Sequence, residues 1–197
     1  MGARDIMPYI SSLGGHHRVI SLPVGDDTSV NTADTSWREG ELVVLATGSD
    51  GIDVEGDGAT TPDADGLSYI AAASSEGLFR TLVGDNTTTG AIDQRMCPCY
   101  QVDLDTEFVT RNVFNNSDVN IGPNGTNTGY EVGTSCGFWR DNTNPGTVSG
   151  DVNGDFGIDI NTNGLVITRI LDAQGDDIGV SGGTADKVVF KMVNLIA

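Results

Sequence analysis

The chain has 197 residues, enough to bury a sizeable core, and its 28 Asp and Glu residues against 10 Lys and Arg residues give a formal net charge of −18. This balance argues against nucleic-acid binding, which requires clustered cations. No apolar run approaches the ~20 residues of a membrane helix, and no apolar segment follows Arg4 as in a signal peptide, so we expect a soluble protein made without export.

The composition favours strands and turns over helices. Lys187 and Lys191 are the only lysines, whereas the chain contains 27 glycines and many Asp, Asn and Thr residues. Exposed helix faces usually carry Glu and Lys, while Gly, Asp, Asn and Thr favour turns and strands. We therefore predict an all-β protein with long loops, built as a β-sandwich or barrel.

Residues 1–36 have the features of an extended N-terminal arm. Two apolar segments, "IMPYI" and "RVISLPV", are separated by Gly14 and Gly15 and followed by a polar run. Such a segment cannot bury enough surface alone. We predict that it either docks on a partner or packs on its own body as an edge strand. The predicted partner contacts are Arg4, Ile6, Met7, Tyr9, Ile10, Arg18, Val19, Ile20 and Leu22.

Residues 37–95 are predicted to form an N-terminal β subdomain. Glu39-Gly40 is typical of a turn, and residues 41–46 form the clearest predicted strand. A second turn follows, after which Ile52 and Val54 resume the alternation. Residues 67–84 fit either a short helix or a strand, because "LSYIA" alternates whereas the apolar spacing further on permits a helix.

Residues 96–197 are predicted to form a C-terminal β-barrel or sandwich subdomain. Apolar and acidic residues alternate in "VDLDTEF", which predicts a half-exposed strand over residues 100–109. The Asn- and Gly-rich "NNSDVNIGPNGTNTG" is a predicted loop. Four further strands are expected within "YEVGTSCGFWRD" and "FGIDIN" and over residues 165–171 and 187–195.

One stretch partly matches a calcium-binding loop. In "SGDVNGDFGIDINTNG", oxygen-bearing side chains from Asp151 to Asp159 occupy positions 1, 3, 5 and 9 of that loop. However, Phe156 stands where the loop needs glycine, and Thr162 where it needs a bidentate acid. The flanking segments are predicted strands rather than helices. We therefore interpret these residues as a turn that leads into a strand, and predict no metal ligands.

The cysteines and histidines do not form a known catalytic or metal-binding pattern. Cys97 and Cys99 are separated by one residue, and Cys136 stands alone, which does not fit a zinc site. A disulfide from Cys136 to either of the others stays open, with reduced, partly buried thiols as the default. His16 and His17 are adjacent, so on an extended chain they point to opposite sides. We predict no catalytic residues, no cofactor and no enzymatic activity.

The segment "WREGELVVLATGSDGIDVEGDGATTPDADGLSYIAAASSEG" resembles the head-decoration, or cement, proteins of tailed bacteriophages. Trp37 and residues 39–45 match the "(F/W)xxGELVxL" strand of those families, which precedes a Gly/Asp turn, a short strand, an Ala/Asp-rich loop and a return strand. The run from Tyr100 through "VGTSCGFWRD" and "GIDIN" to "KVVFKMV" resembles the barrel half of structural proteins on marine phage heads. The Cys-Pro-Cys stretch and the long acidic loops have no counterpart there.

The resemblance implies a β-tulip-like N-terminal part followed by a C-terminal β-barrel. It also implies a structural virion protein, often trimeric, that is made in the host cytoplasm and binds outside the capsid over joints between major-capsid subunits. The expected partners are therefore the major capsid protein and other copies of this chain, without nucleic acid or membrane. Two alternatives remain open: a stand-alone calcium- or glycan-binding β module, and a phage tail or adaptor subunit.

Overall fold

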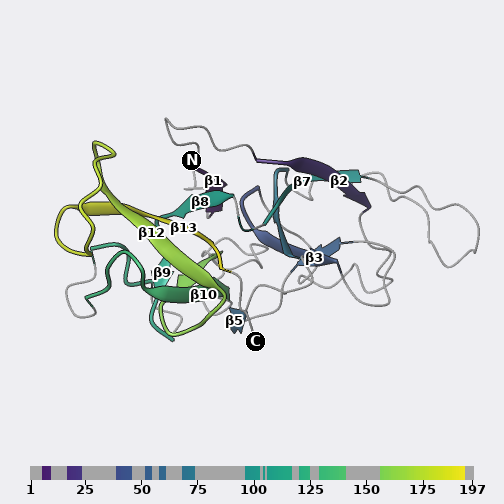
Figure 1. Ribbon diagram of the computed structural model, residues 1–197. Coiled ribbons are helices and arrows are strands. Elements are labelled where there is room, and N and C mark those ends of the chain that lie inside the picture. Colours follow the sequence, from purple (N-terminus) through teal and green to yellow (C-terminus); the bar gives the residue numbers. More distant parts are fainter. Residues whose placement is uncertain are drawn as a thin grey trace, which may run out of the picture.

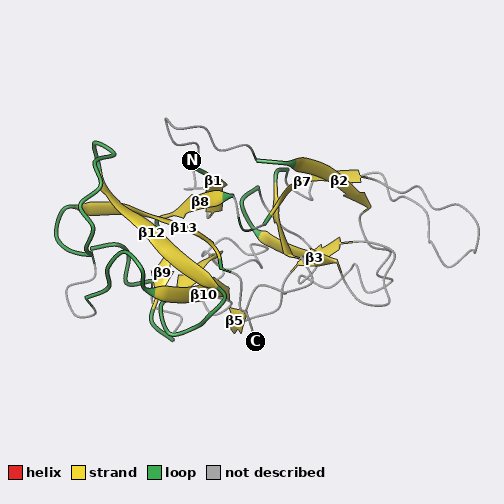
Figure 2. Cartoon of the chain, in the orientation of Figure 1, coloured by secondary structure: helices red, strands yellow, loops and turns green. Residues whose placement is uncertain are grey.

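The structure is a computed structural model that describes twelve parts of the chain. These are residues 6–9, 17–23, 39–45, 52–54, 58–60, 68–73, 96–102, 104, 106–116, 120–124, 129–140 and 156–193. The described residues form strands, turns and connecting segments, and no helix occurs among them (Figure 2). The predicted all-β class is therefore confirmed.

The larger of two sheets contains eight strands in the order β1-β8-β13-β12-β10-β11-β9, with β5 also paired to β10. All pairs are antiparallel except β11 with β9. The strands are β1 (Ile6–Pro8), β5 (Gly58–Thr60), β8 (Glu107–Thr110), β9 (Val113–Phe114), β10 (Ser135–Arg140), β11 (Phe156–Asp159), β12 (Leu165–Asp172) and β13 (Ala185–Met192).

The smaller sheet contains five antiparallel strands in the order β2-β7-β6-β3-β4. It lies on the right of Figure 1, whereas β8, β12 and β13 lie on the left. The amide of Ile6 in β1 donates to the Gly40 carbonyl (3.1 Å) just before β3, which joins the two sheets. The strands are β2 (Val19–Pro23), β3 (Leu42–Leu45), β4 (Ile52–Val54), β6 (Ser68–Ala71) and β7 (Met96–Gln101).

Strand β10 changes partners along its length. Ser135 and Cys136 pair with β12, whereas the residues from Phe138 to Arg140 pair with β5. Gly137 lies at the change, where a Cβ atom would stand only 2.7 Å from Thr162 Cβ. A strand that passes between two sets of partners forms a corner between the layers of a sandwich. The described strand order is open rather than circular, so these strands fit a β-sandwich and do not close into a barrel.

The main hydrophobic core draws on both sheets. Phe190 of β13 contacts Phe108 of β8 and Phe138 of β10, with ring centroids 6.2 and 6.1 Å apart. Ile6 of β1 and Leu42 of β3 are each 1% exposed and belong to the same cluster. Since strands from the N-terminal segments complete this core, the two sheets stabilise each other.

Three predicted strands are confirmed. The strands predicted over residues 41–46, 165–171 and 187–195 correspond to β3, β12 and β13. The single strand predicted over 100–109 is wrong, because β7 ends at Gln101 and β8 begins at Glu107. Leu104 lies in a turn between them and is 43% exposed, so the alternation is interrupted where the chain passes between sheets. Asp on both sides of that leucine favours such a turn.

The structure describes only part of residues 67–84, the segment for which the sequence fits either a short helix or a strand. Ser68–Ala71 is strand β6, and the rest of 67–84 beyond residue 73 lies outside the described residues. The strands expected in "YEVGTSCGFWRD" and "FGIDIN" are β10 and β11.

The two predicted subdomains meet near residue 96, and strands from both sides of this residue pair with each other in both sheets. Strand β7 pairs with β6 in the smaller sheet, and β5 pairs with β10 in the larger one. The division into subdomains stays a prediction.

Candidate interaction surface

The outer face of β1, β8, β12 and β13 carries a group of cations around an apolar centre. Because side chains alternate along a strand, Val188 and Phe190 of β13 enter the core while Lys187, Val189 and Lys191 point outward. We call this surface the cationic face. It consists of Arg111, Arg169, Lys187 and Lys191, together with Met7, Tyr9, Val109, Leu171 and Val189.

A β-bulge brings Arg169 onto this face. Ile167 pairs with Phe190 and points into the core, yet Arg169 pairs with Val189, so the register shifts between Ile167 and Arg169. A regular strand would place two residues that are two positions apart on the same side. The extra residue in the bulge reverses this and directs Arg169 outward. The guanidinium then lies 5.8 Å from the centre of the Tyr9 ring, a cation–π contact.

The apolar centre of the cationic face is nearly inaccessible to water, and Met7 and Tyr9 pack against it. Val109, Leu171 and Val189 are 7%, 4% and 0% exposed, and Met7 and Tyr9 are partly buried. Long side chains such as arginine and lysine cover apolar surface with their stems while their charged ends reach water. The face therefore presents charge at its surface and an aliphatic and aromatic layer beneath.

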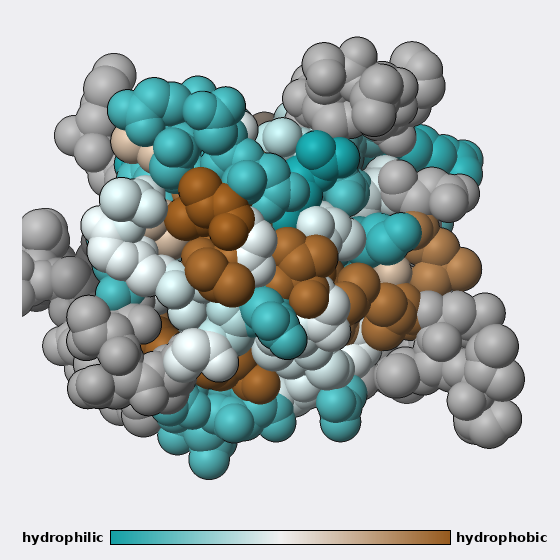
Figure 3. Space-filling model, turned by 60° about the vertical axis from the view of Figure 1, so that its left-hand side comes forward, coloured by the Kyte–Doolittle hydropathy of each residue, from teal (hydrophilic) through white to brown (hydrophobic). Residues whose placement is uncertain are grey.

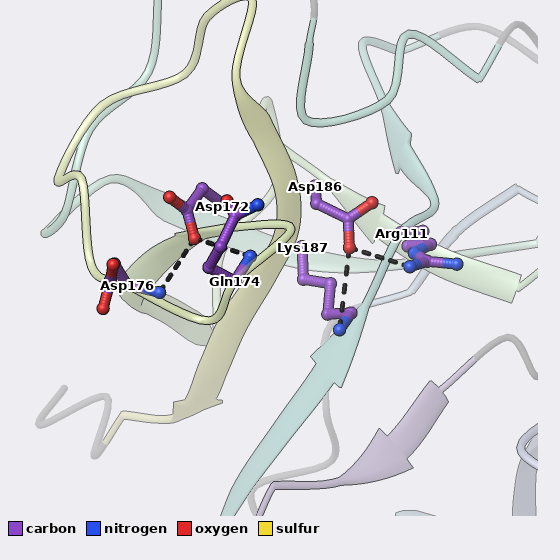
Figure 4. Close-up of polar contacts among 6 residues, drawn as sticks. All are labelled: Arg111, Asp172, Gln174, Asp176, Asp186 and Lys187. Carbon is purple, nitrogen blue, oxygen red and sulfur yellow. Dashed lines mark hydrogen bonds and ion pairs between the residues drawn. The ribbon is translucent and has the colours of Figure 1, made fainter.

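Two carboxylates partly balance the cations. Asp186 Oδ2 lies 2.7 Å from Arg111 Nη2 and 3.6 Å from Lys187 Nζ (Figure 4). Glu107 Oε2 lies 4.0 Å from Arg169 Nε. The hydrogen bond from Arg111 holds the pKa of Asp186 below its ordinary value, and both neighbouring cations reinforce this against partial desolvation. The pair therefore stabilises the fold at neutral pH, and this stabilisation is lost as the pH falls through the lowered pKa.

The distribution of cations is uneven for so acidic a protein. The structure describes the side chains of five Lys and Arg residues, of which four lie on the cationic face and the fifth is Arg18. Glu107 and Asp186 are the carboxylates that pair with them. The Lys191 ammonium makes no ion pair with any described residue. Among the described residues, a local excess of positive charge therefore lies on one face of a chain with a net charge of −18.

A second surface, which we call the acidic end, has the opposite character. It is formed by Glu131, Val132, Asp176, Asp177 and Val180, all exposed. A bridge from Glu131 to Val180 and a hydrogen bond from Val132 N to Gly179 O (3.0 Å) hold its two loops together. These loops project at the left of Figure 1, away from the smaller sheet, and Figure 3 shows hydrophobic patches among hydrophilic residues on that side of the molecule.

The Asp172 carboxylate fixes the loop of the acidic end that follows β12. Its Oδ1 accepts hydrogen bonds from the amides of Gln174 and Asp176, both at 2.9 Å (Figure 4). An aspartate that bonds the backbone two residues on forms an Asx turn, which predefines the loop. The exposed carboxylates of Asp176 and Asp177 are thus presented from an ordered turn.

The structure places the predicted partner contacts of the arm in different surroundings. Ile6 is buried in the core, Met7 and Tyr9 lie on the cationic face, and Ile20 and Leu22 pack against Cys97, Cys99 and their neighbours. Arg18 and Val19 are exposed, whereas Arg4 and Ile10 lie outside the described residues. Strand β1 pairs with β8, and β2 pairs with β7, so these parts of the arm are edge strands of the body. The Ile6 side chain is therefore committed to the core, and partner contacts by Arg18 and Val19 stay a prediction.

The part of the calcium-like stretch that the structure describes serves a turn. Asp159 is 1% exposed, and its Oδ1 accepts hydrogen bonds from the amides of Asn116 (2.9 Å) and Asn161 (3.1 Å). Its other oxygen accepts a hydrogen bond from Thr162. Asp151 lies outside the described residues. The Asp159 carboxylate therefore has three protein donors that occupy its oxygens, which explains its burial without a ligand.

Calcium and chelator tests follow from this interpretation. We expect neither excess calcium nor a chelator to change the free energy of unfolding, and Asp151→Ala to cost little. Asp159→Ala is expected to cost about 1–3 kcal/mol, because three donors lose their acceptor. A specific site at hundredfold excess over its Kd would add about 2.7 kcal/mol in thermal or chemical unfolding. A gain of that size that Asp151→Ala abolishes would contradict the interpretation.

The cysteines are buried thiols in two separate clusters. Cys97, Cys99 and Cys136 are all free, so neither disulfide that the sequence left open is formed. Cys136 belongs to the main core, whereas Cys97 and Cys99 lie in β7 and pack against side chains of the neighbouring strands β2 and β6. Burial, reinforced by the charge of Asp159, raises the pKa of Cys136, and a hydrogen bond with Cys97 together with burial raises the pKa of Cys99. The thiols of Cys99 and Cys136 therefore stay protonated and unreactive at neutral pH.

His17 has a structural environment at the junction of the two sheets. Its Nε2 lies 2.6 Å from the carbonyl oxygen of Glu107, and its ring packs edge-on against Tyr100 and Phe108. Among the residues that the structure describes, no group of three or more His, Cys, Asp and Glu side chains is arranged to hold a metal ion. Nor does this part of the chain contain a helix long and apolar enough to cross a membrane.

Comparison with known proteins leaves the chain without an assigned relative. No family model, no curated protein and no solved structure matches it.

Proposed function

We propose that this chain is a decoration protein that binds the outer surface of a tailed-phage capsid as a homo-oligomer, most simply a trimer. In this role it is a structural protein of the virion exterior, and its partners are the major capsid protein and other copies of itself. The proposal rests on the resemblance around residues 37–77, together with the arrangement of that segment in the fold.

The observation that carries the proposal is the order of strands within the resembling segment. Strand β3 contains the "LVVL" of the opening motif, the short strand β4 pairs with it next along the chain, and β6 returns antiparallel on the other side of β3. This is the succession of opening strand, short strand and return strand that the resemblance implies. The Gly/Asp residues 48–51 lie outside the described residues, and β5, which pairs with β10, precedes β6 in the chain. Strands β3 and β6 also carry core residues, since Leu42 and Ile70 pack in the cluster shared by both sheets.

The edge of the smaller sheet supplies a shell-binding surface under this proposal. Val19 at the start of β2 is 52% exposed, and Arg18, which precedes it, is also exposed. Met96 at the start of β7 is 46% exposed and lies at the other end of this strand pair, opposite Pro23. Methionine and arginine are enriched at protein interfaces. Strand β2 is also an edge strand, whose free side is suited to pairing with an extended segment of another protein.

Binding to preassembled shells tests the proposal. Shells of the major capsid protein encoded in the same genome are mixed with purified chain and sedimented, and the wild-type protein is expected to sediment with them. Val19→Glu is expected to weaken binding by about tenfold or more, because it places a charge in an apolar contact. Leu104→Glu, at a side chain 43% exposed in the turn between sheets, is the matched control. Failure of the wild-type chain to bind any such shell would overturn the proposal.

A further inference from the structure

We propose that the cationic face of one copy binds the acidic end of the next copy in a head-to-tail assembly. This contact specifies the homo-oligomer of the proposed function and rests on that part of it. It concerns a second copy of this chain rather than the shell. The contact is therefore measurable with the purified protein alone.

Complementary charge is the first argument for this contact. The acidic end exposes Glu131, Asp176 and Asp177, and none of them takes part in an ion pair among the described residues. The cationic face offers Lys191, which is likewise without such a pair, and Lys187, which shares Asp186 with Arg111. Opposite charges that form no ion pair among the described residues of one copy are available to its neighbour, and they orient the approach of the two surfaces.

Apolar complementarity is the second argument. Val132 and Val180 are 42% and 52% exposed, and they lie on the two loops of the acidic end, which the bridge between Glu131 and Val180 joins. The cationic face has partly buried Met7 and Tyr9 over its apolar centre. Tyrosine, methionine and arginine are characteristic of the centres of protein interfaces, where a ring of charges surrounds them. Both surfaces therefore combine an apolar centre with charges of opposite sign.

The geometry of the contact determines the type of assembly. The two surfaces are different parts of the chain, because one is the outer face of β8, β12 and β13 and the other is formed by the loops beyond Asp172 and around Glu131. A contact between unlike surfaces is heterologous, and it generates a ring when the rotation between copies closes. A closed ring agrees with the trimer that the proposed function expects. It also lets copies of net charge −18 meet through opposite charges.

Charge reversal on each surface, followed by their combination, tests the contact. The wild-type chain is expected to sediment as one closed oligomer. Lys187→Glu with Lys191→Glu is expected to weaken association about 100-fold, as is Glu131→Lys with Asp176→Lys, at about tenfold per reversed charge. The four changes together are expected to restore association to within about tenfold of wild type. Leu104→Glu, which introduces a charge at a side chain 43% exposed outside both surfaces, is the matched control and should leave the oligomer intact. Melting curves verify that each variant is folded.

The outcomes separate this contact from shell binding. A wild-type chain that is monomeric at all accessible concentrations overturns the contact, and so does an oligomer that persists in both double variants. Weakening by each double variant without recovery in the combination also overturns the pairing of the two surfaces. If the lysine variants keep the oligomer but no longer bind shells, the cationic face belongs to the shell contact and the inference is wrong. If the wild-type chain forms the oligomer and the combined variant restores association, but the wild-type chain does not bind shells, only the proposed function is overturned.

Discussion

A chain that lacks residues 1–24 is expected to lose most or all of its cooperative unfolding transition. The truncation removes β1 and β2, and with them the buried Ile6 and the partly buried Ile20 and Leu22. Fully burying an aliphatic side chain contributes about 1.5–3 kcal/mol, and whole domains are stable by only about 5–15 kcal/mol. Circular dichroism during chemical denaturation measures the effect. A truncated chain with near-normal melting would show that these strands are dispensable.

Single substitutions within the same strands refine this test. Ile6→Ala is expected to lower the free energy of unfolding by about 2–5 kcal/mol, because Ile6 is 1% exposed and packs among core residues of both sheets. Val19→Ala, at a side chain 52% exposed in β2, should change it by less than about 0.5 kcal/mol. Equal effects at the two positions would contradict the placement of β1 in the core.

Gly157→Ala is expected to cost about 3 kcal/mol or more, with loss of the native near-UV spectrum if the strand cannot adjust. Gly157 lies in β11, where an added Cβ would stand 2.6 Å from Asn112 Cβ and nearer still to the Asn112 carbonyl oxygen. The Asn112 backbone cannot withdraw easily, because its carbonyl accepts from Ile158 N (3.1 Å) and its side chain donates to the Phe156 carbonyl (2.8 Å). Overpacking against fixed backbone costs about 1–3 kcal/mol and in tight sites more.

Gly183→Ala is the matched control for this substitution. No atom lies within 4 Å of a Cβ built at Gly183, and its φ angle is not in the left-handed region. We expect a change of less than about 0.5 kcal/mol in urea unfolding. A destabilisation by Gly157→Ala as small as this would show that β11 does not pack on Asn112 as described.

Strands with a regular pattern could be predicted from the sequence, and strands that depend on tertiary pairing could not. The apolar runs of β3, β12 and β13 give a clear signal because each is buried on at least one side over several residues. The alternation over 100–109 continues through Leu104, although the chain turns there to change sheets. Local periodicity does not distinguish a strand from a turn whose residues happen to alternate.

The cationic face could be predicted only in part. Alternation along β13 already places Lys187 and Lys191 on one side, but nothing local indicates that Arg111 lies beside them. That neighbourhood follows from the sheet order, in which β13 lies between β8 and β12. Strict alternation would even have placed Arg169 on the same side as the buried Ile167, and the bulge between them overturns that expectation.

The number of copies bound per shell at saturation tests the central claim most directly. Shells of the major capsid protein are saturated with the purified chain, freed from unbound protein and examined by electron cryomicroscopy together with quantitative gel densitometry. A decoration protein predicts added density on the outer surface over joints between capsid subunits, with a copy number in fixed proportion to those subunits. A chain found at a single vertex would instead be a tail or adaptor subunit, and bare shells in the presence of excess folded protein would contradict the account altogether.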